Sequence, residues 1–270
     1  MNKNDSLAHV RCFLLDMDGT FYLGDQLLNG ARQFIDVLNQ QGCDYLFLTN
    51  NSSKDSRQYA EKFARLGMPV MRDKIMTSGE ATAMHVHRQS PGARVYVVGT
   101  DALENEFRAR GFVLTEAEPD FAVLGFDTTL TYDKMWKLCD RVRAGVPYIA
   151  THPDYNCPTE TGYMPDIGAM IAFVRASTGR EPDLIVGKPN ALFVEQAAER
   201  TGIPLSAMCM IGDRLYTDIA LGETAGIPTI LVLSGETQAH EVTGSPFQPT
   251  YIFDDIQAVA DHLLSLNPKT

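Results

Sequence analysis

Residues 11–20 read RCFLLDMDGT, an apolar run that ends in two carboxylates. A short apolar run without alternation is typical of a strand that is buried on both faces of a parallel sheet. Side chains two residues apart on an extended chain point the same way, so Asp16 and Asp18 would project together from the strand's carboxyl end. Open parallel sheets bind their ligands at that edge. A simple turn at Asp18-Gly19 is the alternative, but it leaves the paired carboxylates unexplained.

The rest of the chain repeats the order strand, helix, strand. The expected strands lie at 45–48, 75–77, 184–186, 207–211, 228–233 and 251–253, and the expected helices at 30–41, 55–66, from about 80 onward, 190–201, 215–224 and 255–265. Such repeats predict a mostly parallel sheet covered on both faces. The expected fold class is therefore α/β, with a Rossmann-like doubly wound parallel sheet as its core.

The middle of the chain has strands and helices of its own. Strands are expected at 95–98, 122–124 and 148–150, and no low-complexity linker or repeat separates this stretch from its flanks. We therefore expect residues 81–182 to form a smaller inserted α/β cap domain, with residues 1–80 and 183–270 forming the catalytic core.

Composition limits the classes of partner. The 270 residues are 44% hydrophobic and 21% charged, as in ordinary soluble proteins, and the net charge is −11 with no basic block. An acidic surface disfavours nucleic acids and anionic membranes. No apolar run approaches the ~20 residues that span a bilayer, and the N-terminal segment lacks a signal-peptide core. Five scattered cysteines without a CxxC pair fit reduced thiols. We expect a cytoplasmic protein.

A second acidic pair follows another apolar run, in the segment IGDRLYTD at 211–218. Asp213 comes directly after the strand and Asp218 lies in the first turns of the next helix. Helix capping by Asp213 is the alternative. Two close carboxylates repel, and a divalent cation is the simplest partner that keeps both ionised. Two acidic pairs at strand ends therefore predict a magnesium site, since Mg²⁺ prefers oxygen ligands.

Two further strand ends carry groups that suit a phosphate. Thr49, Asn50 and Asn51 follow one strand and offer a hydroxyl and backbone N–H groups. A local turn made by these side chains would explain an isolated TNN equally well. Lys188, between Gly187 and Pro189, follows the expected strand at 184–186 and would add positive charge.

Four motifs follow one another along the chain: DxDGT, a strand ending in Thr, a Lys, and GDxxxD. In this order they resemble the four motifs of the haloacid dehalogenase superfamily of phosphatases. The likeness covers nearly the whole chain. The TNN variant, the GDRLYTDI segment and the position of the insertion resemble the NagD / p-nitrophenyl-phosphatase branch, which has a large α/β cap.

The resemblance implies a role for each motif residue. Asp16 would be the nucleophile that forms an aspartyl-phosphate, and Asp18 the general acid and base. Mg²⁺ would be held by Asp16, the backbone carbonyl of Asp18 and Asp213, with Asp218 in support. Thr49 and nearby amides would bind phosphoryl oxygens, and Lys188 would offset negative charge.

The segment 151–168 resembles the cap loop that contacts the leaving group in this branch, which makes Asp154, Tyr155 and Tyr163 candidates for substrate contact. Two residues depart from the branch pattern: His152 stands where Asn is common, and Asp166 where Gly is common. We interpret His152 as a loop histidine with its hydrogen bonds satisfied, and Asp166 as the start of a helix at 167–178.

The expected function is Mg²⁺-dependent hydrolysis of a small phosphomonoester, with sugar phosphates, nucleoside monophosphates, pyridoxal phosphate and phosphoglycolate all open as substrates. A phosphotransferase or phosphomutase of the same superfamily is an alternative. A phospho-acceptor signalling module is a weaker one, because such a module has no need of Asp18. The expected partner is a small phosphorylated metabolite, with no nucleic acid and no membrane, and a homodimer is compatible with the sequence.

Overall fold

The computed structural model describes residues 7–159 and 162–266. The first six residues of the N-terminal segment and two residues of the expected cap loop therefore lie outside the described residues. The chain divides into two compact units. The first unit takes the residues up to 48, residues 60–75 and the residues from 188 onward; the second takes 49–59 and 76–187. None of the helices in the described part of the chain is long and apolar enough to span a lipid bilayer.

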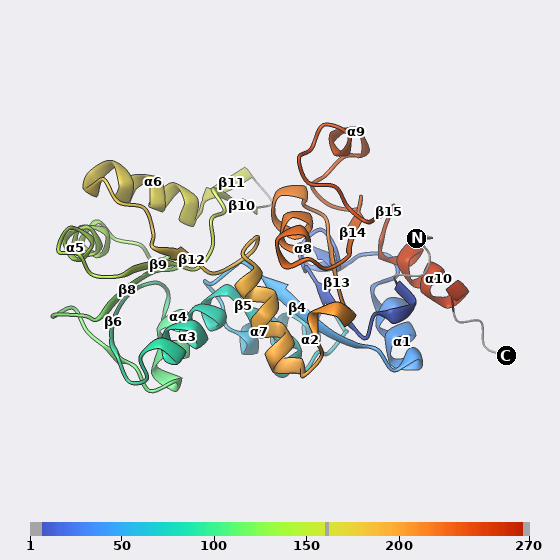
Figure 1. Ribbon diagram of the computed structural model, residues 1–270, viewed down its shortest axis with the longest axis horizontal. Coiled ribbons are helices and arrows are strands. Elements are labelled where there is room, and N and C mark those ends of the chain that lie inside the picture. The colour runs from blue at the N-terminus through green and yellow to red at the C-terminus, as the bar shows by residue number, and fades with distance from the viewer. Residues whose placement is uncertain (1–6, 160–161, 267–270) are drawn as a thin grey trace. The chain divides into compact units, whose positions relative to one another are not determined.

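A six-stranded sheet with the order β15-β14-β13-β1-β4-β5 forms the centre of the first unit (Figure 1). The pairings from β15 through to β4 are all parallel, and Leu15 lies opposite Ile211 on one side and Phe47 on the other. The strands are β1 (Cys12–Leu15), β4 (Asp44–Thr49), β5 (Ile75–Thr77), β13 (Met208–Gly212), β14 (Thr229–Val232) and β15 (Tyr251–Phe253). Strand order reverses at β1 and β13, the position at which such sheets bind ligands.

Helices follow these strands and cover the sheet. Every residue of β1 and of β13 is buried, and because successive side chains point to opposite faces, both faces must be covered. Helix α1 packs against α10, and α7 against α8 (Figure 1). The helices are α1 (Ala31–Gln41), α2 (Ser56–Arg65), α7 (Ala191–Thr201), α8 (Ala220–Ala225), α9 (Ala239–Val242) and α10 (Ile256–Leu266), with 3₁₀ turns at Leu7–His9, Arg72–Lys74 and Leu205–Ala207 and a small hairpin of β2 (Tyr22–Leu23) and β3 (Gln26–Leu27).

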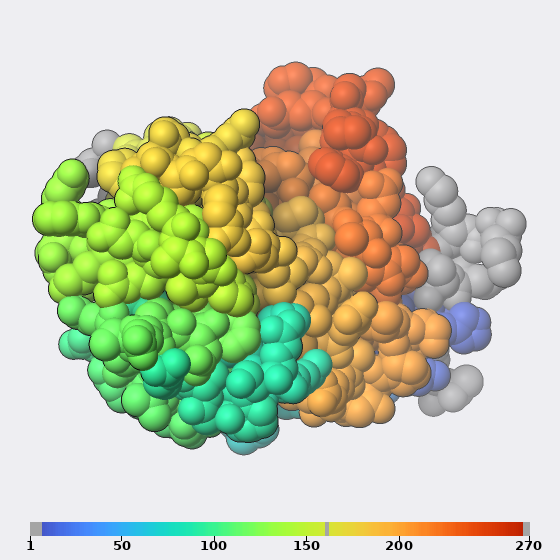
Figure 2. All heavy atoms as spheres, turned by 60° about the vertical axis from the view of Figure 1, so that its left-hand side comes forward, coloured from blue at the N-terminus to red at the C-terminus, as the bar shows by residue number. Residues whose placement is uncertain are grey.

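The second unit has its own parallel sheet, in the order β12-β9-β8-β6-β7. Residues 76–187, coloured from teal to gold, gather into one body in both views (Figures 1 and 2). A separate core includes Leu124, Leu138, Tyr148 and Val174. The strands of this sheet are β6 (Arg94–Val98), β7 (Val113–Leu114), β8 (Phe121–Leu124), β9 (Tyr148–Ala150) and β12 (Leu184–Ile185). The helices of the unit are α3 (Ser78–Gln89), α4 (Asp101–Ala109), α5 (Tyr132–Arg143) and α6 (Ile167–Thr178). Outside the sheet, β10 (Asn156–Thr159) pairs with β11 (Gly162–Pro165) in an antiparallel hairpin.

The predicted α/β class with parallel sheets is confirmed, but two local expectations are wrong. The strand expected at 184–186 was placed in the first sheet, whereas β12 pairs with β9 in the second. An apolar run shows that a strand is buried and does not show which sheet buries it. The helix expected at 215–224 begins instead as one turn of π-helix at Leu215–Ile219 before α8. Single π-turns of this kind are frequent at functional sites.

Candidate active site

Three carboxylates converge at the carboxyl ends of two neighbouring strands. Asp16 follows β1, Asp213 follows β13, and Asp218 lies in the π-turn after β13. Each offers an oxygen, and these oxygens all lie within 4.8 Å of one another. Because β1 and β13 pair in parallel, the residues that follow them leave the sheet at the same edge. The structure thus brings together three acids that are up to 202 positions apart, Asp16 and Asp218 being the most distant.

Lys188 lies within this acidic cluster. Its Nζ contacts the Asp16 carboxylate, donates to Asp218 Oδ1 at 2.7 Å and donates to the carbonyl of Leu48 at 3.3 Å. Its side chain is only 3% exposed. Burial alone would lower the pKa of Lys188, but the negative charges of Asp16 and Asp218 outweigh that effect and raise it. The ammonium therefore stays charged and offsets part of the carboxylates' charge.

The remaining negative charge is what a cation would stabilise. Burial is the main cause that raises the pKa of Asp213 and of Asp218, and the charge of Asp16 raises both further, while Lys188 opposes the shift at Asp218. Three converging carboxylates are hard oxygen ligands, and one lysine leaves them undercompensated. The donor set therefore fits a divalent ion such as Mg²⁺.

Backbone packs directly against the acids because glycines stand beside them. A Cβ at Gly212 would lie 2.2 Å from Cγ of Asp218, and one at Gly235 would lie 2.0 Å from Oδ2 of Asp213. The N–H of Glu236 donates to that same Oδ2 at 2.7 Å. Any side chain at these two glycines would push the carboxylates out of position.

Asp18 lies on the solvent side of the cluster. Its side chain is 56% exposed, yet the surrounding protein raises its pKa, first by desolvation and also through the charge of Asp16. Lys62 acts in the opposite direction: its Nζ is 4.0 Å from Asp18 Oδ1 and 3.6 Å from the centroid of the Tyr22 ring. A carboxyl group with a raised pKa is suited to donate a proton near neutral pH.

Lys62 was missed by the sequence interpretation. It lies in the last turn of α2, where a basic side chain is ordinary because it complements the helix dipole. Its position beside Asp18 depends on how α2 packs, and the local sequence does not predict that packing. Arg214 was missed as well: its Nε pairs with Glu236 Oε2 at 2.9 Å, and its side chain is 17% exposed.

The segment Thr49-Asn50-Asn51 leaves β4, the strand next to β1. Thr49 Oγ1 accepts a hydrogen bond from the N–H of Asn51, and Asn51 Oδ1 accepts from the N–H and hydroxyl of Ser53. The local turn offered as an alternative is therefore present. Asn50 is used differently, since its side-chain amide donates to both oxygens of Asp154 at 3.2 Å.

The other candidates from the expected cap loop behave differently from one another. Tyr155 and Tyr163 are 65% and 77% exposed, and their role in substrate contact stays a prediction. His152 and Asp166 are both buried, with His152 Nε2 3.0 Å from Asp166 Oδ1. Asp166 also accepts from the N–H of Ile167 and caps α6. The interpretations of His152 as satisfied and of Asp166 as a helix start are confirmed.

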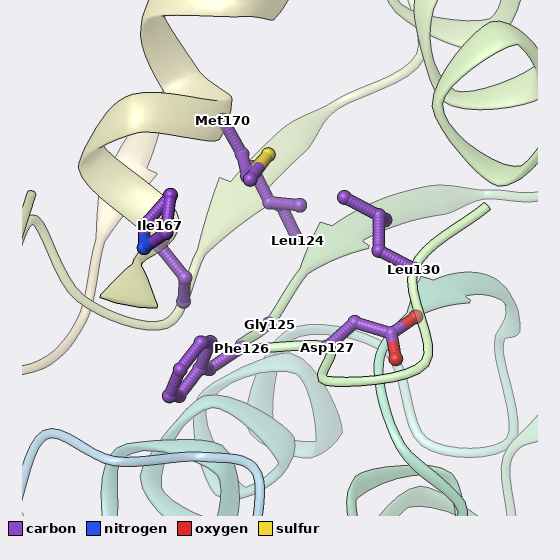
Figure 3. A pocket seen from close by; sticks show the side chains of 8 residues that line it. Leu124, Gly125, Phe126, Asp127, Leu130, Ile167 and Met170 are labelled. Carbon is purple, nitrogen blue, oxygen red and sulfur yellow. The ribbon is translucent and has the colours of Figure 1, made fainter. Parts of the chain in front are cut away.

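A small cavity of about 10 Å³ lies beyond the end of β8 in the second unit (Figure 3). Its lining is mainly apolar and includes Leu124, Leu130 and Met170, while Asp127 at its rim is paired with Lys134 at 2.5 Å. This volume holds about one water molecule. None of its lining residues is a predicted site residue, so the candidate active site rests on the acidic cluster.

Comparison with known proteins agrees with the geometry. Models of haloacid dehalogenase-like hydrolases match residues 13–113 and 185–259. The acid sugar phosphatase of Staphylococcus saprophyticus is 37% identical over 258 residues, covering 95% of this chain and 99% of the relative. The chain belongs to the haloacid dehalogenase-like hydrolases. Its motifs are therefore those of an enzyme, a phosphatase of this family.

Solved structures place this family member in a branch. The 4-nitrophenylphosphatase of Thermotoga maritima superposes with a TM-score of 0.93 at 46% identity, covering 95% of this chain and 98% of the other. A glycerol phosphate phosphatase of Mycobacterium tuberculosis in complex with magnesium has a TM-score of 0.87 at 34% identity, with coverage of 94% and 78%. The resemblance to the NagD / p-nitrophenyl-phosphatase branch is confirmed.

Proposed function

We propose that this protein is a magnesium-dependent phosphatase that hydrolyses small phosphomonoesters, sugar phosphates first among them, through an aspartyl-phosphate on Asp16. The observation that carries the proposal is the convergence of Asp16, Asp213 and Asp218 with Lys188. The names of the relatives, an acid sugar phosphatase and a 4-nitrophenylphosphatase, support the substrate class.

Asp16, Asp213 and the backbone carbonyl of Asp18 would hold Mg²⁺, with Asp218 in support. When bound, the ion supplies positive charge that keeps the carboxylates ionised and attracts an anionic phosphoryl group. This explains how a protein of net charge −11 could accept an anionic substrate: the ion and Lys188 together offset the negative charge of the three carboxylates.

In the proposed mechanism, the carboxylates of Asp16 and Asp18 carry out the bond-forming and proton-transfer steps. An oxygen of Asp16 attacks phosphorus, the ester P–O bond breaks, and Asp18 gives its proton to the departing alkoxide. Asp18, now ionised, takes a proton from water as that water attacks the phosphorus of the aspartyl-phosphate. Inorganic phosphate leaves and Asp16 is restored. Lys188 offsets charge on Asp16 and on the phosphoryl oxygens throughout.

Substrate binding is assigned to two segments. Thr49, with Asn50 and Asn51, would bind the phosphoryl oxygens. The proposed cap, residues 81–182, would recognise the leaving group through Asp154, Tyr155 and Tyr163. Substitution of one of these cap residues should therefore change the KM values for different phosphorylated sugars. It should have a smaller effect on the turnover of p-nitrophenyl phosphate.

Metal removal tests the proposal first. The protein should release p-nitrophenol and inorganic phosphate in equal amounts from p-nitrophenyl phosphate with Mg²⁺, and EDTA should abolish release until Mg²⁺ is restored. Undiminished turnover in EDTA would refute the metal assignment. Less phosphate than phenol when glycerol is added would show transfer to an alcohol and favour the phosphotransferase alternative.

The nucleophile is tested by substitution. Asp16→Asn removes the attacking oxygen anion and nearly preserves shape, so turnover should fall by at least ~10³-fold while the protein stays folded. Asp25→Asn, at an exposed position, serves as the control and should be unchanged. An active Asp16→Asn protein would remove the aspartyl-phosphate from the mechanism.

A further inference from the structure

A buried chain of hydrogen bonds runs through the second unit, centred on His152. The ring is fully buried, with Nε2 3.0 Å from Asp166 Oδ1 and Nδ1 3.2 Å from the hydroxyl of Thr151. The Thr151 hydroxyl lies 2.9 Å from that of Ser52, which accepts from the N–H of Phe126 at 2.8 Å. We call Asp166, His152, Thr151 and Ser52 the His152 network.

The donors and acceptors available in this network indicate which group donates in each of its hydrogen bonds. Ser52 accepts from Phe126, so its own proton is free to go to Thr151, whose proton in turn goes to Nδ1 of His152. A neutral ring that accepts at Nδ1 carries its proton on Nε2, where Asp166 is the acceptor. Every hydrogen in this arrangement then has a partner, with the ring proton on Nε2.

The network joins three segments that are distant in sequence. Ser52 directly follows the segment 49–51, which the proposed function assigns to phosphoryl oxygens. Thr151 and His152 belong to the loop after β9, and Asp166 caps α6. Asn50 is held from both sides: the hydroxyl of Ser78 donates to its carbonyl at 2.5 Å, and its side-chain amide donates to Asp154.

Close packing leaves little room for this arrangement to relax. A Cβ at Gly187 would lie 2.6 Å from Oδ1 of Asn50 and 3.0 Å from Cβ of His152, and one at Gly168 would lie 2.4 Å from the carbonyl oxygen of Pro153. The His152 ring also meets that of Phe126 edge to face at 6.4 Å between centroids. A buried network that is fully satisfied and tightly packed favours one conformation.

We propose that His152 is a positioning residue: with Asp166 and Thr151 it holds Ser52, and through Ser52 the segment 49–51, in the orientation that binds the phosphoryl group. The inference rests on the proposed function of that segment. It also gives the two departures from the branch pattern a common reason, because His152 and Asp166 are hydrogen-bond partners of each other. His152 does not itself contact the reacting atoms in this role.

The test compares two variants that break the network and one that conserves it with a variant that only weakens the core. Thr151→Val removes the hydroxyl and keeps the shape, His152→Ala removes the ring, and Asp166→Asn keeps an acceptor oxygen for Nε2–H. Leu138→Ala truncates a buried residue elsewhere in the same unit and is the stability control. The measurements are kcat and KM for p-nitrophenyl phosphate, the inhibition constant for inorganic phosphate, and the melting temperature.

We expect Thr151→Val and His152→Ala to lower kcat/KM and weaken inhibition by phosphate, each about 10- to 100-fold, because loss of orientation costs binding as well as rate. Asp166→Asn should stay within a few-fold of the original protein. Leu138→Ala should melt lower and keep its kinetic constants. Equal kinetics for Thr151→Val and Leu138→Ala would overturn the inference.

A second readout separates this inference from the proposed function. ¹⁵N NMR of the unmodified protein should show the proton of the His152 ring on Nε2 and none on Nδ1, and Thr151→Val should change the Nδ1 resonance. A proton found on Nδ1 would overturn the network whatever the activity. An unmodified protein that fails to turn over p-nitrophenyl phosphate, yet shows the Nε2–H tautomer, would refute the proposed function and leave the network standing.

Discussion

Charge decides the behaviour of the individual residues in the candidate site. Lys188 is buried between Asp16 and Asp218, so its ammonium is held charged and would take part in the neutralisation that the proposed phosphoryl transfer requires. Lys62 has a different task. It lies beside the half-exposed Asp18 and lowers a pKa that desolvation raises. One lysine compensates the acids proposed to bind metal, and the other lowers the pKa of the proposed proton donor.

Substitution of Lys62 by Met should move the pH dependence of the enzyme. Asp18 must be protonated to act as the general acid, so kcat/KM falls at pH values above its pKa. Because Lys62 lowers that pKa, Lys62→Met should raise it and shift the basic limb of the kcat/KM profile to higher pH. Steady-state rates measured across the pH range would show the shift.

Lys74 offers a matched control for that experiment. It pairs with Asp44 and lies 5.7 Å from the centroid of Tyr45, much as Lys62 lies beside Asp18 and Tyr22. Lys74→Met should leave the basic limb in place. A profile that Lys62→Met does not move, or that Lys74→Met moves equally, would speak against the role given to Lys62.

At the scale of elements, the site depends on how strands end. Strand β13 finishes at Gly212 and passes directly into Asp213 and the π-turn, which turns Asp218 back toward the same edge. The N–H of Arg214 donates to Asp218 Oδ2 at 3.1 Å and holds this tight return. Only a residue without a side chain fits at the end of β13, because Asp218 occupies the space that a Cβ would need.

Gly212→Ala should therefore disable the site. The added methyl group would displace Asp218, lowering turnover by at least ~100-fold and the free energy of unfolding by about 1–3 kcal/mol. Gly244→Ala, where a Cβ would meet open space, is the control and should leave both quantities nearly unchanged. Turnover assays and urea unfolding measure the two effects, and a fully active Gly212→Ala protein would contradict the placement of Asp218.

At the scale of the whole molecule, the acidic cluster links stability to pH and metal. Burial and mutual repulsion raise the pKa of Asp213 and Asp218 above the value of about 3.9 for an aspartate in an unfolded chain. Between these values the folded state binds more protons than the unfolded state. The contribution of these two groups to the stability of the metal-free protein should therefore be greatest below the unfolded pKa and be lost as pH rises through the folded pKa values.

Magnesium should reverse that loss. Ionised carboxylates bind the cation, so its stabilising effect should grow as pH rises, reaching about 2.7 kcal/mol at a concentration of 100 Kd. Melting temperatures recorded with EDTA and with Mg²⁺ at pH 5 and at pH 8 should show a larger difference at pH 8. In Asp213→Asn the difference should nearly vanish at both pH values, and a persisting metal effect in that variant would place the cation elsewhere.

The sequence alone determined most of the larger elements and the membership of the acidic cluster. Helix α6 and strands β5, β9 and β15 have the predicted bounds, because periodicity and turn residues are local signals. Asp16, Asp213 and Asp218 were predictable as neighbours because residues that follow parallel buried strands leave one edge of one sheet. Lys188 was also predicted to join them, although the strand before it belongs to the other sheet.

Only the tertiary structure decided which distant groups meet. The pairing of β12 with β9, the approach of Lys62 to Asp18 and the bond between His152 and Asp166 each depend on packing between elements. A local sequence pattern indicates whether a residue is buried or polar. It does not indicate which distant residue will contact it in the folded protein. Those partners affect the pKa of the proposed proton donor and the orientation of the segment proposed to bind phosphate.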